Sequence, residues 1–229
     1  MPYNQDMGID TVAFLDTDLK NLRPSVLHKE LEKRIGKCIY LRGYDESPYP
    51  NLDSEGEDWS LYCGNLDLNE AVRTRQLTLR KNTKDFFLEL GFYNNTFEIE
   101  ELEINGRRLQ LFDYRFNQFC ELLSENTESI LKDLKDCIEV VNQYLRPIIH
   151  ASRLFLCGDQ VYVDGKEVLA DKIFEGMSID QAIEFEANSI EPNPLYTWDN
   201  LDILMKDYIG WGIFDFDLDK LPTYITSIQ

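Results

Sequence analysis

The middle of the chain, residues 59–112, alternates apolar and polar residues with a period of two. The clearest run places four apolar side chains on one face: Phe86, Leu88, Leu90 and Phe92. Asn105-Gly106 is the strongest turn signal, since both residues tolerate the positive φ angles of a two-residue hairpin. This pattern predicts a meander of antiparallel strands.

With regular pairing, the strand residues next to the first turn of this meander and those next to its second turn would place their apolar side chains on opposite faces of the sheet. The turn at Asn94-Asn95 and the turn at Asn105-Gly106 each fix which residues share a face. The two faces agree only if one residue is inserted between the turns. We therefore expect a β-bulge near Glu100 and Glu101.

The segments before and after the meander have other periods. The apolar run Ile9–Leu15 predicts a strand, Pro24–Ile35 a helix, and Cys38–Leu41 a second strand, which together make a strand-helix-strand opening. After the meander, apolar residues recur every three or four positions from Phe116 to Tyr144. They predict helices that are divided near residues 124–128, capped at Asn126 or Thr127, and ended by Pro147.

The C-terminal third contains several turn and cap signals. Gly158-Asp159 predicts a hairpin that joins residues 153–157 to residues 161–163, and Asp164-Gly165 is a further turn signal. Ser178 with Gln181 forms a capping box for a helix through Ala187. Thr197 is expected to cap another helix that reaches about Tyr208.

Antiparallel strands flanked by grouped helices indicate an α+β fold rather than a doubly wound parallel one. We expect a single domain over residues 1–229. Within it, residues 1–147 form the sheet and long helix, and residues 148–229 form an acidic region of helices and a hairpin.

Charge limits the classes of partner. The chain of 229 residues has 42 acidic and 23 basic residues, a net charge of −19. Nucleic acids and anionic membranes bind clustered Lys and Arg, so this balance argues against direct contact with either. The charge is uneven, because residues 151–229 hold 15 acidic and 5 basic residues.

The cysteines bear on the compartment. Five of them occur without a CxxC pair, which indicates reduced thiols rather than a disulfide framework or a zinc site. The N-terminus has no basic region before its apolar run, so no secretory signal is predicted. We expect a cytoplasmic protein.

A second acidic concentration occupies residues 44–59, which contain two prolines and no Lys or Arg. Acids between aromatic residues suit recognition of a basic protein, because Tyr and Trp act as anchors and carboxylates steer the encounter. A solvated loop that only improves solubility is the alternative. The predicted partner-binding residues are Tyr44, Asp45, Glu46, Tyr49, Asp53, Glu55, Glu57, Asp58 and Trp59.

A different set of carboxylates suggests chemistry. VAFLDTD ends in Asp16 and Asp18 after an apolar strand, and RLFLCGDQVYVD places Asp159 and Asp164 after another. In outline these motifs resemble the first and last motifs of the haloacid dehalogenase superfamily. The resemblance implies Asp16 as nucleophile and Asp18 as acid/base, with all four aspartates around Mg²⁺. That family has a parallel sheet, however, whereas this chain predicts antiparallel strands, and its Ser/Thr and Lys motifs are not identified here.

Other catalytic patterns are weak. Asp215, Asp217 and Asp219 in IFDFDLDK could begin a Ca²⁺ or Mg²⁺ site, but an edge strand with its acids in water explains them more simply. His28 and His150 are the only histidines, and neither a phosphate-binding glycine motif nor a zinc motif is present.

Three functions remain open. The favoured one is an acidic binding protein without a cofactor that recognises a basic protein, of the inhibitor or immunity type, including one that mimics nucleic acid. The alternatives are a divalent-metal-dependent phosphohydrolase that uses the DxD at Asp16 and Asp18, and a structural subunit of a larger assembly.

Overall fold

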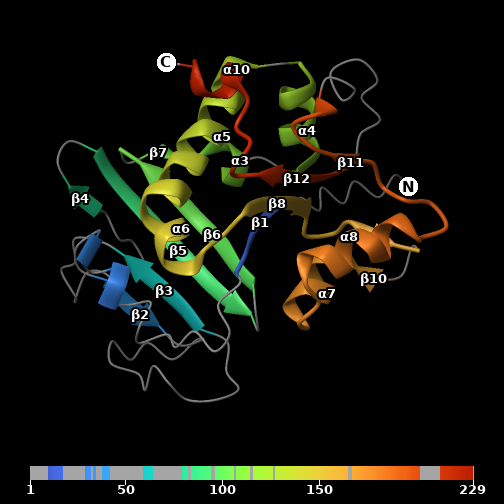
Figure 1. Ribbon diagram of the computed structural model, residues 1–229, viewed down its shortest axis with the longest axis horizontal. Helices are drawn as coiled ribbons and strands as arrows, with labels where there is room; N and C mark the ends of the chain where they lie inside the picture. The colour runs from blue at the N-terminus through green and yellow to red at the C-terminus, as the bar shows by residue number, and fades with distance from the viewer. Residues whose placement is uncertain are drawn as a thin grey trace, which may run out of the picture.

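The computed structural model describes residues 10–17, 29–31, 33–34, 38–41, 59–63, 79–81, 84–93, 96–105, 107–113, 116–125, 127–164, 167–201 and 212–228. Their fold is α+β, as predicted, and is organised around one large sheet (Figure 1). The strands of this sheet are β1 (Thr11–Asp16), β2 (Cys38–Leu41), β3 (Trp59–Cys63), β4 (Leu79–Lys81), β5 (Lys84–Tyr93), β6 (Thr96–Ile104), β7 (Arg107–Arg108), β8 (Arg153–Gly158), β11 (Leu195–Tyr196) and β12 (Ile213–Asp217). Their order is β11-β12-β8-β1-β6-β5-β3-β2, with β4 paired to β5 and β7 to β6.

The expectation of a purely antiparallel sheet is wrong, because the sheet is mixed. β11 runs parallel to β12, with Leu195 opposite Ile213 and Tyr196 opposite Phe214. Segment 197–212 joins these two strands, and parallel neighbours need such a crossover connection. The other described pairings in the sheet are antiparallel.

The meander contains the expected bulge. Glu89 pairs with Glu101 and Leu90 pairs with Ile99, so Glu100 is the inserted residue on β6. Asn105 has a φ of 56°, the left-handed conformation expected of the turn before β7. After β7 the chain turns into α3 (Gln110–Asp113) instead of continuing as a strand.

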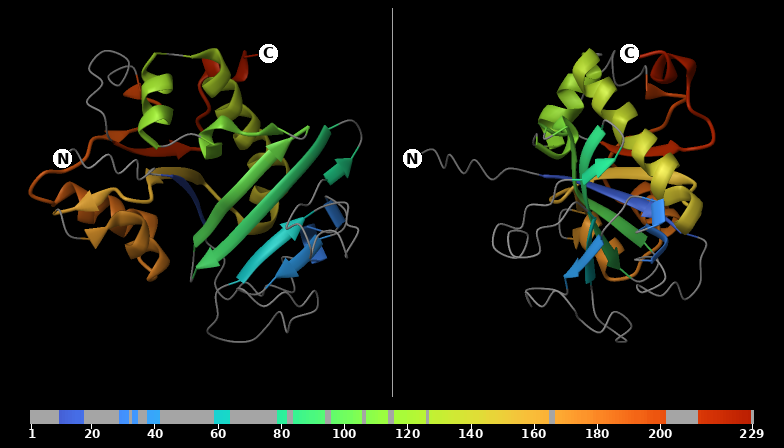
Figure 2. Two further views of the ribbon diagram at one scale, coloured as in Figure 1. Left: turned by 180° about the vertical axis from the view of Figure 1, so that it is seen from behind. Right: turned by 90° about the vertical axis from the view of Figure 1, so that its left-hand side faces the viewer.

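Helices cover both faces of the central strands (Figures 1 and 2). α4 (Phe116–Ser124) and α5 (Glu128–Val140) lie on one face, where Phe119 of α4 packs edge-on against Phe214 with 5.4 Å between the ring centroids. On the other face lie α7 (Leu169–Phe174) and α8 (Ile179–Ala187), and Phe174 packs against Phe14 at 5.3 Å. Alternate residues of β1, β8 and β12 therefore belong to two apolar layers.

Pro147 does not end the helix where expected. A π-helical segment, η1 (Val141–Leu145), follows α5, and the helix continues as α6 (Arg146–Ile149) with Pro147 in its first turn. A π turn changes the hydrogen-bond spacing at the position where proline supplies no N–H, so the chain remains helical. The helix ends at His150, whose φ is 56°.

The predicted hairpin across Gly158-Asp159 is also wrong. β8 pairs with β1 and β12, and the hairpin instead joins β9 (Tyr162–Val163) to β10 (Glu167–Val168). Asp164 has the positive φ of 53° at that turn. Since β8 and β12 belong to the same sheet as β1, the sheet crosses the expected division at residue 147.

Several local predictions are confirmed. Thr127 occupies the N-cap position of α5, although its side chain makes no capping hydrogen bond. The capping box of α8 forms as Ser178 Oγ accepts the Gln181 N–H while Gln181 Oε1 accepts the Ser178 N–H. β2 has the predicted bounds, although β6, β5 and β3 separate it from β1. A short helix, α10 (Thr223–Thr226), ends the described chain. Within the described residues, no helix is both long and apolar enough to cross a bilayer.

Candidate functional site

Three strand ends meet at one end of the sheet. Because β8 is antiparallel to both of its neighbours, its first residue lies near the last residues of β1 and β12. The Asp16 carboxylate closes this corner by accepting hydrogen bonds from the backbone N–H groups of Ser152 (2.7 Å) and Arg153 (3.0 Å) and from Ser152 Oγ (2.5 Å). Both oxygens of Asp16 are thus engaged in holding the chain that enters β8.

Arg153 is the centre of the charge at this corner. Its guanidinium contacts Asp180 Oδ1 at 2.5 Å and Asp215 Oδ1 at 3.5 Å. Burial alone would lower the pKa of Arg153, but the carboxylates of Asp180, Asp215 and Asp16 raise it. One cation therefore joins three acids that come from α8, β12 and β1.

Asp215 is largely removed from solvent. Its side chain is 18% exposed, and burial raises its pKa while Arg153 partly opposes that change. Its Oδ1 has no hydrogen-bond partner among the described residues and depends on the ion pair with Arg153. The expectation that β12 is an edge strand with all of its acids in water is wrong, because β12 lies between β11 and β8.

A cavity of about 310 Å³ opens beside this cluster, and we call it the aspartate cleft. It is lined by Ser152, Arg153, Thr197, Trp198, Asp199, Asp215, Asp217, Asp219 and Lys220. A second cavity of about 310 Å³ shares Ser152 and Arg153 with the cleft and is also lined by Asp16, His150 and Asp180. Acidic side chains thus line two cavities that both border Ser152 and Arg153.

Trp198 forms an aromatic wall of the cleft. Its ring stacks on Phe216 with 4.1 Å between the ring centroids, and its indole N–H donates to the carbonyl oxygen of Asp217 at 2.9 Å. These contacts fix the orientation of the ring. An immobilised indole beside carboxylates is a favourable environment for an organic cation.

Ion pairs also border the cleft. Lys220 contacts Asp217 at 2.9 Å, and this contact lowers the pKa of Asp217. Asp219 pairs with Arg146. With four aspartates and two basic residues among its described lining residues, the cleft has an excess of negative charge that favours a Lys or Arg side chain.

The residues predicted to bind a partner fall largely outside the described part of the chain. Tyr44, Asp45, Glu46, Tyr49, Asp53, Glu55, Glu57 and Asp58 are among the residues not described. Trp59 begins β3, where it pairs with Phe92 of β5. The aspartate cleft is a different acidic and aromatic surface, formed by the C-terminal third.

The carboxylates of the predicted magnesium site are not brought together. Asp159 lies beside Asp10, whose N–H donates to it at 2.8 Å, at the start of β1, whereas Asp16 ends that strand about 20 Å away. The cause is the antiparallel pairing of β1 with β8, which places the two apolar-strand motifs at opposite ends of the sheet. Asp164 belongs to the turn after β9, and Asp18 lies outside the described residues. Among the residues that are described, no group of three His, Cys, Asp or Glu side chains is placed to hold a metal ion.

Sequence reasoning missed Arg153, Asp180 and Trp198. One signal was available: Arg153 is a lone base at the start of the apolar run RLFLC, and a base next to a buried strand usually has an acidic partner. Its partners could not be found from spacing, because they lie on β1, α8 and β12.

Comparisons with protein-family models, with curated proteins and with solved structures give no match to this chain.

Proposed function

We propose that this chain is an acidic binding protein that recognises a basic protein partner, as an inhibitor or immunity-type protein does. The observation that carries the proposal is the aspartate cleft, where Asp199, Asp215, Asp217 and Asp219 line a cavity beside the fixed ring of Trp198. Carboxylates accelerate encounter with a basic surface, and a rigid aromatic residue supplies the contact that slows dissociation.

The distribution of charge supports the same function. Residues 167–201 contain eight acidic residues and one lysine, Lys172. The acidic and aromatic segment at residues 44–59 remains a second predicted contact with the same kind of partner. A basic protein is attracted to both concentrations of acidic residues.

The geometry gives less support to a hydrolase. Asp16 would have to act as the nucleophile, yet both of its oxygens accept hydrogen bonds from Ser152 and Arg153. The proposal therefore assigns Asp16 to positioning the start of β8 and Arg153.

Affinity capture from a lysate of the source organism tests the function. The immobilised chain is compared with the variant Asp199→Asn/Asp219→Asn, and bound proteins are eluted with increasing salt. A matched control, Glu121→Gln/Glu128→Gln, removes the same charge from exposed positions on α4 and α5.

We expect the chain and the control variant to retain a basic protein that the cleft variant retains poorly. Increasing salt should elute this protein. Retention of a protein that is not basic, or binding that salt does not weaken, would contradict the proposal.

A further inference from the structure

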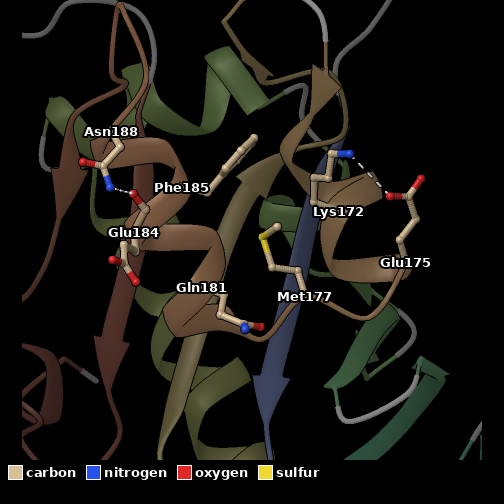
Figure 3. A pocket seen from close by; sticks show the side chains of 7 residues that line it. All are labelled: Lys172, Glu175, Met177, Gln181, Glu184, Phe185 and Asn188. Carbon is tan, nitrogen blue, oxygen red and sulfur yellow. Dashed lines mark hydrogen bonds and ion pairs between the residues drawn. The ribbon is translucent and has the colours of Figure 1, made fainter.

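A third cavity, on the acidic C-terminal region, lies between α7 and α8 (Figure 3). Its volume is about 560 Å³, and we call it the α7–α8 groove. Figure 3 shows Met177 and Phe185 toward its middle, Lys172 and Glu175 on one side, and Glu184 with Asn188 on the other. The groove is separate from the aspartate cleft, since the two have no lining residue in common.

The floor of the groove is apolar and adaptable. Met177 and Phe185 are both half-buried, packed against the hydrophobic core on one side and open to the groove on the other. A thioether next to an aromatic ring can adjust to different apolar side chains. The floor thus suits one large apolar side chain of a ligand.

The rims of the groove are acidic. Lys172 is the single base among the described lining residues, and its ammonium is held by Glu167 at 2.9 Å and Glu175 at 3.5 Å. On the opposite rim Glu184 is exposed. Among the described residues no ion pair is formed by the Glu184 carboxylate, so it can pair with a cation that approaches from solvent.

The lining of the groove favours an elongated ligand, such as a short helix. On α8 and its C-cap the lining consists of Gln181, Glu184, Phe185 and Asn188, which follow the i, i+3, i+4, i+7 spacing of one helix face. This stripe is about 10 Å long. A peptide segment that lies along a helix face uses such a stripe, as in helix-in-groove recognition.

We propose that the α7–α8 groove binds a basic, amphipathic segment of the protein partner, with one large apolar side chain inserted between Met177 and Phe185 and a flanking Lys or Arg paired with Glu184. This inference rests on the proposed function and adds the chemistry of the segment that is recognised. Charge complementarity selects the occupant, because eight acids and one lysine in residues 167–201 disfavour an acidic or neutral segment.

A pair of labelled peptides tests the groove. Both have 12 residues and the same number of lysines in a helical pattern, and they differ only in a central leucine that is replaced by serine. Fluorescence anisotropy measures their binding to the full chain, to Glu184→Gln and to Glu191→Gln, an exposed control that removes the same charge outside the groove lining.

We expect the leucine peptide to bind about tenfold more tightly than the serine peptide, because the leucine loses its contact with water in the groove. Glu184→Gln should weaken the leucine peptide several-fold, whereas Glu191→Gln should leave its Kd within twofold. Asn188 lines the groove, so the emission of a fluorophore attached at Asn188→Cys should change when the leucine peptide binds.

Equal binding of the two peptides, absence of binding, or equal effects of Glu184→Gln and Glu191→Gln would each overturn the groove assignment. The same variants separate this inference from the proposed function. If the captured basic partner binds the full chain and Glu184→Gln equally well, the groove inference fails and the function stands. If no basic partner is captured while the leucine peptide binds as expected, the function fails and the groove remains a peptide-binding surface.

Discussion

Arg107 and Asp133 form a two-pronged ion pair that ties the β6–β7 hairpin to α5. The Arg107 Nη atoms lie 2.7 Å and 3.1 Å from the two oxygens of Asp133, which also accepts the Gln110 N–H. Asp133 is 1% exposed, whereas the Arg107 side chain is 50% exposed. The two residues are thus unequal partners, because only the carboxylate depends on the pair for its solvation.

This inequality predicts unequal effects of mutation. Arg107→Leu leaves a buried carboxylate without its cation and should lower the free energy of unfolding by about 3 kcal/mol. The double variant Arg107→Leu/Asp133→Asn should recover part of the loss, since it removes the buried charge as well. Urea denaturation measures both values, and equal stability of Arg107→Leu and the unmodified chain would contradict the interpretation.

The local elements were predictable because their signals lie close together in the sequence. The capping box of α8 needs only Ser178 and Gln181, and the bulge at Glu100 follows from counting residues between two turns. Pro147 shows the limit of such rules, since a π turn accommodates it within a continuing helix.

Strand partners were not predictable from local signals. Gly158-Asp159 satisfies the chemistry of a hairpin turn, yet β8 pairs with β1 and β12, which lie far away in the sequence. The candidate site follows from these distant pairings. Asp16 and the acids of β12 were noticed in the sequence as separate motifs, and only the sheet order brings them to the same arginine.

Asp215 and Asp217 should respond to pH in opposite directions, although they lie on the same face of β12. Burial raises the pKa of Asp215, so the folded state favours the protonated form of this side chain. The resulting contribution to the free energy of unfolding is lost as the pH rises through the raised pKa. Lys220 lowers the pKa of Asp217, so the folded state favours the charged form of Asp217. The contribution of Asp217 to the free energy of unfolding is therefore present above its pKa in the unfolded chain and is lost as the pH falls through the lowered pKa.

Thermal denaturation between pH 2 and pH 7 checks this contrast. At pH 7, Asp217→Asn should destabilise by a few tenths of a kcal/mol, the usual contribution of an exposed ion pair, and the loss should vanish in acid. At pH 7, Asp215→Asn should either raise stability or lower it less than Asp217→Asn does. In acid, the stability of Asp215→Asn should equal that of the unmodified chain. A larger loss for Asp215→Asn at pH 7 would be inconsistent with its raised pKa.

Three cysteines should resist modification in the folded protein. Burial raises the pKa of Cys137 to about 12, with added repulsion from Asp133 and Asp136, and burial also raises the pKa of Cys120 and Cys157. A thiol reacts as its thiolate, so these side chains are both covered and protonated at pH 8. Iodoacetamide labelling followed by peptide mass spectrometry should find them unmodified before denaturation and modified after it. Rapid labelling of any of the three in the native protein would contradict this placement.

Asp16 should contribute to stability and not to metal binding. Asp16→Ala removes an acceptor from two backbone N–H groups and the Ser152 hydroxyl, and should cost about 1–3 kcal/mol of unfolding free energy. Because Asp159 lies at the other end of β1, millimolar Mg²⁺ should leave the Tm unchanged. A rise in Tm with Mg²⁺ that Asp16→Ala abolishes would instead favour the hydrolase.

The aspartate cleft makes a kinetic prediction for the captured basic partner. Asp199→Asn removes a charge from the cleft and should lower the association rate and its dependence on salt, while dissociation changes little. Trp198→Leu removes the aromatic wall and should mainly raise the dissociation rate, by about tenfold for an anchor residue. Surface plasmon resonance at two salt concentrations separates these effects, with Tyr162→Leu as a control at an exposed aromatic residue outside the cleft. If Trp198→Leu and Tyr162→Leu release the partner at the same rate, Trp198 is not an anchor, and the cleft contributes to recognition only through its charge.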